Sequence, residues 1–154
     1  MASITASPAI ALSQPRSSAR ATRRGRYALL SLATVAAAVL ANVAVYYLGA
    51  LVVGYNSGFI VLANPSGIAL FTVVPAIVAT LVYGGLLRFT RRPERTFSII
   101  AAIVFVVTTI PDFTYIPSVP GATNGQTAIL VLTHIVAAAV IIGMLTKLSR
   151  RQPR

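Results

Sequence analysis

The sequence of 154 residues has no cysteine and no tryptophan, and it has one histidine, one aspartate and one glutamate. Without cysteine, disulfide bonds, CxxC redox motifs and thiolate metal sites are excluded. One imidazole and two carboxylates also fall short of the three or four ligands with which one chain holds a zinc ion or a di-metal centre. We therefore expect no built-in metal and no other cofactor.

The scarcity of ionisable groups also limits catalysis. His134, Asp112 and Glu94 are single representatives of their types, and Glu94 lies in a basic linker far along the chain from His134. Hydrolysis by two carboxylates needs both of them in one site. Neither a nucleophile elbow with a Ser-His-Asp set nor a glycine-rich phosphate loop is present. We therefore expect a protein that is not an enzyme.

Charged residues make up 10% of the chain and hydrophobic residues 56%, whereas an average soluble domain has about 25% charged residues. The thirteen lysines and arginines fall into three clusters beside apolar runs. These clusters are Arg16, Arg20, Arg23, Arg24 and Arg26; Arg88, Arg91, Arg92 and Arg95; and Lys147, Arg150, Arg151 and Arg154. Such placement is typical of membrane topology and of contact with anionic lipid headgroups. We expect a lipid bilayer and no nucleic acid as partner.

Four segments approach or reach the roughly 20 apolar residues that cross about 30 Å of hydrocarbon as a helix. The predicted spans are residues 27–50, 65–88, 93–110 and 126–148. Asn64 suits a helix N-cap and Pro65 the first helical position, and Pro111 is expected to end the third span. The conformation of the connection 51–64 is left open, because its apolar piece 58–63 has no decisive periodicity.

The loops predict the topology. The connection 51–64 carries no charge and the connection 111–125 carries only Asp112, so every cation lies in the middle linker or in a terminal tail. By the positive-inside rule, four spans then place both termini in the cytoplasm. The predicted fold is an all-α, polytopic four-helix bundle of the bacterial plasma membrane, with a disordered basic tail over 1–26 and a basic tail over 149–154.

Two alternatives concern the N-terminal part of the chain. The acid-poor tail, rich in arginine and serine, shares its composition with organelle transit peptides, and Arg23-Arg24 resembles a twin-arginine signal without its apolar continuation. The other alternative is that the first apolar run is a cleaved signal peptide, so that cleavage would leave three spans. This run is longer than the apolar region of a typical signal peptide.

Polar groups at membrane depth are the candidate site. At 1.5 Å per residue, Asn42 and His134 both lie about 12 Å from the outer ends of their spans, with Thr108 slightly shallower. Asp112 follows Pro111 at the outer edge, where turn chemistry also explains it; as a partner for His134 it would need the loop to fold inward. The candidate intramembrane site therefore consists of His134, Asn42, Asp112 and Thr108. His134 has two interpretations: an interhelical hydrogen-bonding group that reaches Asn42 or a carbonyl freed by Pro75, or a group that binds a ligand or a proton.

The first span also carries a polar and small stripe that we expect to face the bundle interior. Steps of three, four, four and seven residues place its members on one helix face. The stripe comprises Ser31, Thr34, Ala38, Asn42 and Gly49. A second set of small residues four apart, a spacing that favours helix contact in lipid, comprises Ala33, Ala37 and Ala41; Ala76, Thr80 and Gly84; and Ala139 and Gly143.

The stretches "RFTRRPERTFSIIAAIVFVVTTIPD" and "AILVLTHIVAAAVIIGML" resemble small bacterial four-span proteins, the domain-of-unknown-function family 6069. The shared features are the basic linker with Arg-Pro before an aromatic residue, Pro111 at the end of the third span, and His134 early in the fourth. The resemblance implies the four-span fold over roughly residues 28–148. It implies no catalytic residue, because the family has no established activity.

These observations favour a non-enzymatic integral membrane protein, such as an accessory or partner-binding subunit that associates with itself or with another membrane protein. An alternative is an oligomeric component for permeation of a small solute or of protons that uses His134. A haem or quinone protein is a third interpretation, in which two histidines ligate haem across a dimer.

Overall fold

The computed structural model describes residues 16–56 and 58–148, with the side chains of 24–56 and 58–147. This part of the chain forms four long helices and no strand: α1 (Arg16–Val53), α2 (Pro65–Phe89), α3 (Pro93–Thr114) and α4 (Asn124–Gly143). Two short 3-10 helices, η1 (Ile60–Leu62) and η2 (Ile116–Ser118), follow α1 and α3, and a π-helical turn, η3 (Met144–Leu148), continues α4. The prediction of an all-α four-helix bundle is confirmed.

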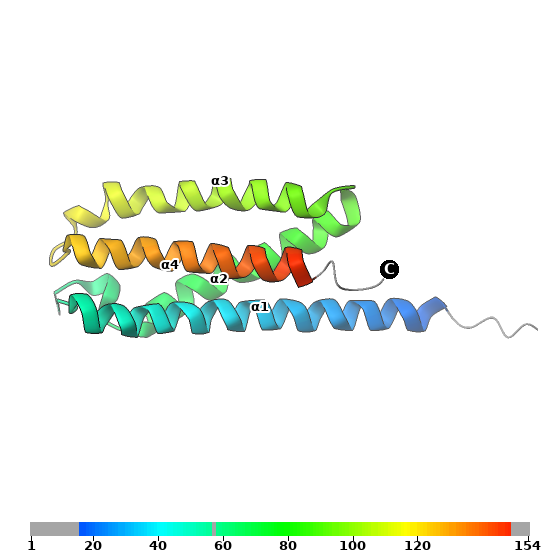
Figure 1. Ribbon diagram of the computed structural model, residues 1–154, viewed down its shortest axis with the longest axis horizontal. Helices are drawn as coiled ribbons and strands as arrows, with labels where there is room; N and C mark the ends of the chain where they lie inside the picture. The colour runs from blue at the N-terminus through cyan, green and yellow to red at the C-terminus, as the bar shows by residue number, and fades with distance from the viewer. Residues whose placement is uncertain (1–15, 57, 149–154) are drawn as a thin grey trace, which may run out of the picture.

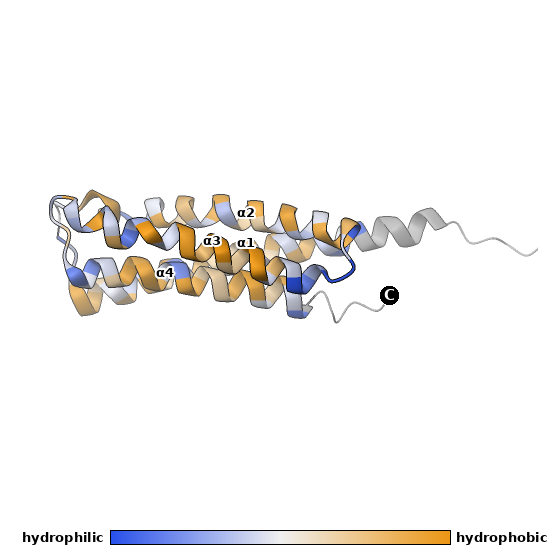
Figure 2. Ribbon diagram, turned by 90° about the horizontal axis from the view of Figure 1, so that it is seen from above, coloured by the Kyte–Doolittle hydropathy of each residue, from blue (hydrophilic) through white to orange (hydrophobic). Residues whose placement is uncertain are grey.

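The four helices lie side by side and alternate in direction, so that α1 begins and α4 ends at the same end of the bundle (Figure 1). The main contacts of α1 are with α2 and α4, and those of α3 are with the same two helices. All four helices are long and apolar enough to cross a membrane by length and composition. Apolar residues predominate along all four helices (Figure 2), and many large ones are exposed on the surface of the bundle, as expected where lipid rather than water is the solvent.

The beginning of α1 corrects the sequence-based prediction. We expected residues 1–26 to be a disordered tail, but α1 begins at Arg16, so 16–26 are helical; residues 1–15 lie outside the described part. Once a helix is nucleated, each added residue gains one hydrogen bond at small cost. The span that follows supplies this nucleus, and the arginines and alanines of 16–26 are good helix formers.

The end of α3 is a second correction. We expected Pro111 to end the third span at residue 110, but α3 continues through Pro111 to Thr114. A proline inside a helix removes one backbone donor without forcing the chain to stop, where other groups stabilise the next turn. Here Tyr115 N donates to Pro111 O at 2.9 Å and Thr114 Oγ1 donates to Ile110 O at 3.0 Å. The extra turn makes Asp112 a helical residue rather than a turn residue.

The other helix ends agree more closely with the prediction. Asn64 is the N-cap of α2, where its side chain accepts from Ser66 N at 3.2 Å, and Pro65 is the first helical residue. The fourth helix begins two residues before the predicted 126. Thr123 and Gln126 form a capping box, in which the side chain of each accepts a hydrogen bond from the backbone N–H of the other. The predicted C-terminal tail, 149–154, lies outside the described residues.

The buried residues form two apolar clusters, one toward each end of the bundle. The inner cluster, on the side where α1 begins and α4 ends, comprises Ala38, Ala76, Tyr83, Phe97, Ile141 and Leu145. The outer cluster comprises Tyr46, Phe59, Leu62, Ile68, Ile116 and Leu130. The α1–α2 and α3–α4 connections both contribute to the outer cluster. They touch at Gly121, where a Cβ would lie 2.8 Å from Gly58 C. The two loops therefore cover the outer end of the helices.

Candidate intramembrane polar site

A layer of buried polar side chains separates the two apolar clusters. Along the chain, each of these residues lies between a member of the inner cluster and a member of the outer cluster; on α1, for example, Asn42 lies one turn from Ala38 and one turn from Tyr46. The polar layer comprises Asn42, Thr72, Thr109, Asp112 and Thr133, with the partly exposed His134 beside it. The sequence predicted polar groups at this level along the helices, but it named only some of the members of the layer.

The α1 stripe predicted to face inward is confirmed. Thr34, Ala38, Asn42 and Gly49 are all buried, and Ser31 is half-buried. The alternative face, Ala33, Ala37 and Ala41, is less buried, and Ala33 is exposed. Polar and small residues together, rather than small residues alone, therefore mark the contact face of this helix.

Asn42 connects α1 to α2. Its Nδ2 donates a hydrogen bond of 2.9 Å to Thr72 Oγ1, which in turn donates to Ile68 O at 2.7 Å. This differs from the hypothesis that Asn42 accepts a hydrogen bond from His134. Asn42 Oδ1 is buried and has no hydrogen-bond partner among the described residues. Thr72 was absent from the predicted site. It lies one turn before Ala76 and two turns before Thr80, two residues of the set four apart that the sequence did identify on this helix.

His134 and Asp112 connect α4 to α3. His134 Nδ1 lies 3.1 Å from Asp112 Oδ2 and 3.0 Å from Leu130 O, one turn back on its own helix. The Asp112 side chain is 7% exposed and the His134 side chain 34% exposed. The extension of α3 through Pro111 creates this pair, because it turns Asp112 toward α4. The partner of His134 is therefore Asp112, and neither Asn42 nor a carbonyl freed by Pro75.

The surroundings of Nδ1 select the tautomer of the neutral imidazole. Leu130 O can only accept a hydrogen bond, and an unprotonated Nδ1 at 3.0 Å would face it with a second lone pair. Nδ1 therefore carries the hydrogen, and Nε2 is the acceptor. The Nδ1–H points at Leu130 O rather than at Asp112. Asp112 Oδ2 is therefore close to Nδ1 but accepts no well-aligned hydrogen bond from any described residue. A buried carboxylate oxygen in that state is a place where a proton or a water molecule is stabilised.

Thr108 does not belong to the site, contrary to the prediction. Its side chain is exposed, and its hydroxyl donates back to Val104 O at 2.8 Å. The next residue, Thr109, is the buried one, and its Oγ1 donates to Phe105 O at 2.7 Å. One residue is about 100° of helical rotation, so a small error in the orientation of α3 exchanges the two threonines.

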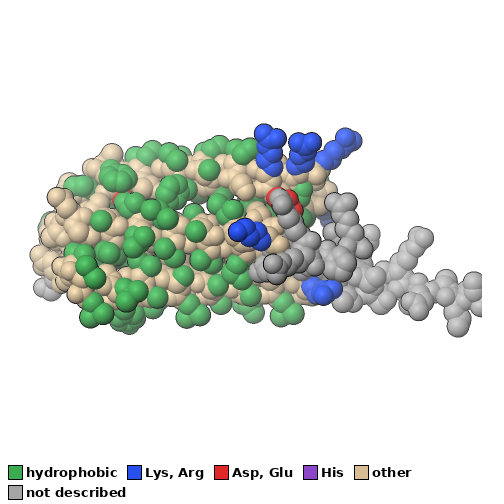
Figure 3. Space-filling model, viewed as in Figure 1, with side chains coloured by type: hydrophobic (Ala, Val, Ile, Leu, Met, Phe, Trp, Pro, Cys, Tyr) green, Lys and Arg blue, Asp and Glu red, His purple; other side chains and the backbone are tan. Residues whose placement is uncertain are grey.

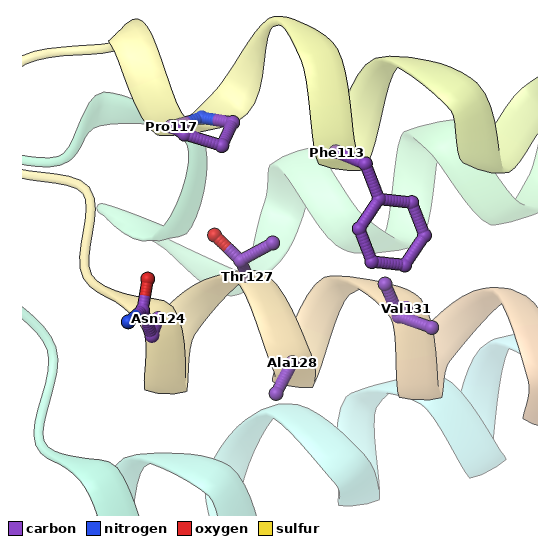
Figure 4. Close-up of a pocket in the computed structure, with 6 residues that line it drawn as sticks. All are labelled: Phe113, Pro117, Asn124, Thr127, Ala128 and Val131. Atoms are coloured by element: carbon purple, nitrogen blue, oxygen red, sulfur yellow. The ribbon is translucent and has the colours of Figure 1, made fainter.

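A groove lies between α3 and α4 on the side of the bundle, near the connection between these two helices. Its volume is about 270 Å³, and its walls are formed by Phe113, Pro117, Asn124, Thr127, Ala128 and Val131. Figure 4 shows Phe113 and Pro117 on one side, facing Val131, Thr127 and Asn124 of α4. The groove is apolar apart from its two polar side chains, Asn124 and Thr127, which lie at the outer end of α4.

The described lysine and arginine side chains gather at the end of the bundle where α1 begins and α4 ends (Figure 3). These are Arg24 and Arg26 of α1, Arg88 of α2, Arg91 and Arg92 of the α2–α3 connection, Arg95 of α3 and Lys147 of η3. Glu94, in the first turn of α3, lies at this same end. Within the described residues, no group of three or more His, Asp or Glu side chains could hold a metal ion.

Comparison with known proteins identifies the family. The model of a family of unknown function (DUF6069) matches residues 18–151, so the chain belongs to this family. No curated protein and no solved structure matches the chain. The resemblance inferred from the basic linker, Pro111 and His134 is confirmed.

Proposed function

We propose that this DUF6069 member is a non-enzymatic accessory protein of the bacterial plasma membrane, and that it binds a proton at the His134–Asp112 pair. The observation that carries this proposal is the 3.1 Å contact between the chain's only histidine and its only aspartate, with the carboxylate buried at membrane depth. Ionisable groups inside a membrane domain are costly, and they commonly mark functional sites.

The distribution of charge supports the proposed orientation. The described cations lie at the end of the bundle where α1 begins and α4 ends. Cytoplasmic termini satisfy the positive-inside rule and bring these side chains to anionic headgroups. The His134–Asp112 pair then lies in the half of the membrane domain that faces away from the cytoplasm.

The two apolar clusters favour proton binding over conduction by a single chain. A proton path needs a connected series of polar groups or water molecules. On the cytoplasmic side the layer is flanked by Phe97, Ile141 and Leu145, and the hydroxyls of the buried Thr34 and Thr80 donate to carbonyls of their own helices. A site that is closed toward one side of the membrane suits a protein whose stability or partner binding depends on protonation. The partner in this proposal is a second copy of the chain or another membrane protein.

Permeation is the second candidate function, and one observation favours it. His134 is partly exposed between α3 and α4 rather than enclosed within the bundle. A route for protons or a small solute would therefore run between copies of the chain, along the α3–α4 face. This version requires an oligomer.

The proposal can be tested with ¹⁵N-histidine NMR, because one histidine gives one set of ring signals. In nanodiscs, we expect the ring of the wild type to take up a proton as the pH is lowered. Asp112→Asn should change the way these ring signals depend on pH, because the substitution removes the carboxylate that lies 3.1 Å from Nδ1. Identical titration of the two proteins would refute a shared proton site.

Two further measurements separate the alternatives. Proteoliposomes with an internal pH dye test permeation: proton flux in the wild type that is absent in His134→Gln would favour the second candidate over the accessory role. Reporter fusions at residues 56, 93, 122 and the C-terminus test the orientation. An external signal at 93 would contradict the cytoplasmic placement of the α2–α3 connection.

A further inference from the structure

The groove between α3 and α4 changes in polarity along its length. Its wall on α4 consists of Asn124, Thr127, Ala128 and Val131, whose spacing places them on one face of the helix. The two polar residues come first, at the outer end of α4, and Val131 lies about 10 Å beyond Asn124 at a rise of 1.5 Å per residue. The groove is therefore polar at its outer end and apolar further along the helices.

Thr127 differs from the other threonines of the helices. Apart from the N-cap Thr123, each of the other threonines between residues 34 and 146 donates its hydroxyl to a carbonyl three or four residues earlier. Thr127 Oγ1 makes no such bond and has no hydrogen-bond partner among the described residues. Its hydroxyl is therefore available to a ligand.

The free polar groups face the groove. Figure 4 shows the Thr127 oxygen directed across the groove, toward the wall that carries Pro117, with Asn124 beside it at the same end. The Asn124 side chain is exposed and likewise has no hydrogen-bond partner among the described residues. A threonine hydroxyl and an asparagine amide can each donate and accept a hydrogen bond. These bonds have little competition from water where hydrocarbon surrounds them.

The charges of the bundle indicate that the polar part of the ligand is neutral. The six residues that line the groove are all uncharged. The described lysine and arginine side chains lie at the other end of the bundle (Figure 3), and the ionisable residue next to the groove is an acid, Asp112, which precedes Phe113. An anionic headgroup would therefore find no described cation here to compensate its charge.

The polarity and size of the groove match a lipid with one chain. The groove lies on two helices that are long and apolar enough to cross a membrane. Lipids place their polar heads at the membrane surface and their chains in the hydrocarbon core, which is the order of polar and apolar walls along the groove. The volume of about 270 Å³ is just below the roughly 300–1,000 Å³ of pockets for drug-sized ligands. This space suits part of one acyl chain rather than two.

We propose that the α3–α4 groove binds a neutral lipid of the monoacylglycerol class. Its hydroxyl and ester groups form hydrogen bonds with Thr127 and Asn124, and its single acyl chain packs against Phe113 and Val131. This ligand site goes beyond the proposed function, because it uses neither His134 nor Asp112. The titration of His134 and the binding of this lipid can therefore fail independently of each other.

The probe is 1-dodecanoylglycerol, titrated into the full chain in phosphatidylcholine nanodiscs. Methyl NMR of ¹³C-labelled threonine and alanine reports on the groove through Thr127 and Ala128, and Thr108 is an internal control, since it is exposed on α3 and does not line the groove. We expect saturable shifts at Thr127 and Ala128 and no saturable shift at Thr108. Parallel, unsaturated shifts at all three methyl groups would mean general partitioning into the bilayer, and would overturn the proposal.

A second probe tests the headgroup. Dodecyl phosphate has a chain of the same length and an anionic head, and it should bind more weakly than 1-dodecanoylglycerol in the same nanodiscs. Equal or tighter binding of the phosphate would refute a site for a neutral lipid. This comparison needs no variant of the protein.

Two variants test the location. Thr127→Val preserves the shape and removes the hydroxyl, so the affinity for 1-dodecanoylglycerol, followed at Ala128, should fall about threefold to tenfold, as the loss of one neutral hydrogen bond predicts. Thr108→Val is its control and should leave the affinity unchanged. Ala128→Phe fills the groove and, followed at Thr127, should weaken binding at least about tenfold. Ala139→Phe is the control for this variant, because Ala139 is exposed on the same helix and does not line the groove. Unchanged affinity in a folded Thr127→Val or Ala128→Phe would overturn the proposal.

Discussion

His134 Nδ1 lies 3.1 Å from Asp112 Oδ2, and this contact joins α4 to α3 within two segments that are long and apolar enough to span a membrane. Replacing one residue of such a pair leaves the buried polar group of the other without its partner and lowers stability. Replacing both by apolar residues can leave stability unchanged. We predict that His134→Leu lowers the free energy of unfolding at pH 8 by about 2 kcal/mol. This is less than the roughly 3–5 kcal/mol for a fully buried pair, because about one-third of the imidazole is not covered by the protein. The double variant His134→Leu/Asp112→Leu should recover most of this loss.

The measurement is unfolding in detergent by SDS titration, followed by circular dichroism, for the two single variants and the double variant. The cycle gives the coupling energy directly. Additive losses, with no recovery in the double variant, would mean that the contact contributes nothing to stability.

Thr72 provides a second prediction, because it is the hydrogen-bond acceptor for Asn42. Thr72→Val preserves the shape but leaves Asn42 Nδ2 without this acceptor. Interhelical hydrogen bonds in membranes contribute about 0.6 kcal/mol on average and up to about 1.7, so we expect a loss of about 1 kcal/mol in the same assay. Thr108→Val is the matched control, since Thr108 is an exposed threonine that bonds only to its own helix. A similar loss in both variants would show that the effect is local to the helix.

The sequence predicted the architecture well because the membrane restricts the alternatives. Spanning helices must satisfy their own backbone groups, and their apolar length and flanking cations are directly visible. The start of α2 was predicted from Asn64 and Pro65 because this cap uses neighbouring residues. The capping box of Thr123 and Gln126 was equally visible as a local pattern, and recognising it would have placed the start of α4 correctly.

The composition of the site was less predictable, because it depends on the rotation of helices about their axes. Asn42 was placed inward because α1 carries a long stripe of small and polar residues. The third helix has no such stripe, so the choice between Thr108 and Thr109 had no local basis. The contact between Asp112 and His134 depended on whether Pro111 ends the helix, which tertiary packing decides.

Gly49 supplies a third prediction, because α1 is closely approached there. A Cβ at this position would lie 2.6 Å from Tyr55 Oη and 2.8 Å from Ile129 Cδ1. Both side chains would have to move, so Gly49→Ala should lower the free energy of unfolding by about 1–3 kcal/mol, as overpacking does elsewhere. Gly85→Ala is the control, since a Cβ there meets nothing within 4 Å; it should be neutral or slightly stabilising. Equal stability of the two variants would refute close packing at Gly49.

Tyr55 gives a prediction about pH, in the loop outside the spans. Its hydroxyl donates to Tyr46 O at 2.7 Å. Burial, and to a smaller extent the neighbouring phenol of Tyr46, raise the pKa of Tyr55 above its ordinary value of 10.0. Because the folded-state pKa exceeds the unfolded one, the stabilisation from this group is complete below about pH 10 and is lost as the pH rises through the folded-state pKa.

Tyr55→Phe should therefore lower the free energy of unfolding by about 1 kcal/mol at pH 8, the contribution of one hydrogen bond. Above pH 10 the stability of the variant should also fall less steeply than that of the wild type, because the variant lacks the Tyr55 hydroxyl, whose deprotonation destabilises the folded state. Tyr47→Phe is the control, as the Tyr47 side chain is 55% exposed, and it should follow the wild-type pH curve. An alkaline decline in Tyr55→Phe as steep as that of the wild type would show that deprotonation of Tyr55 does not release the outer loop.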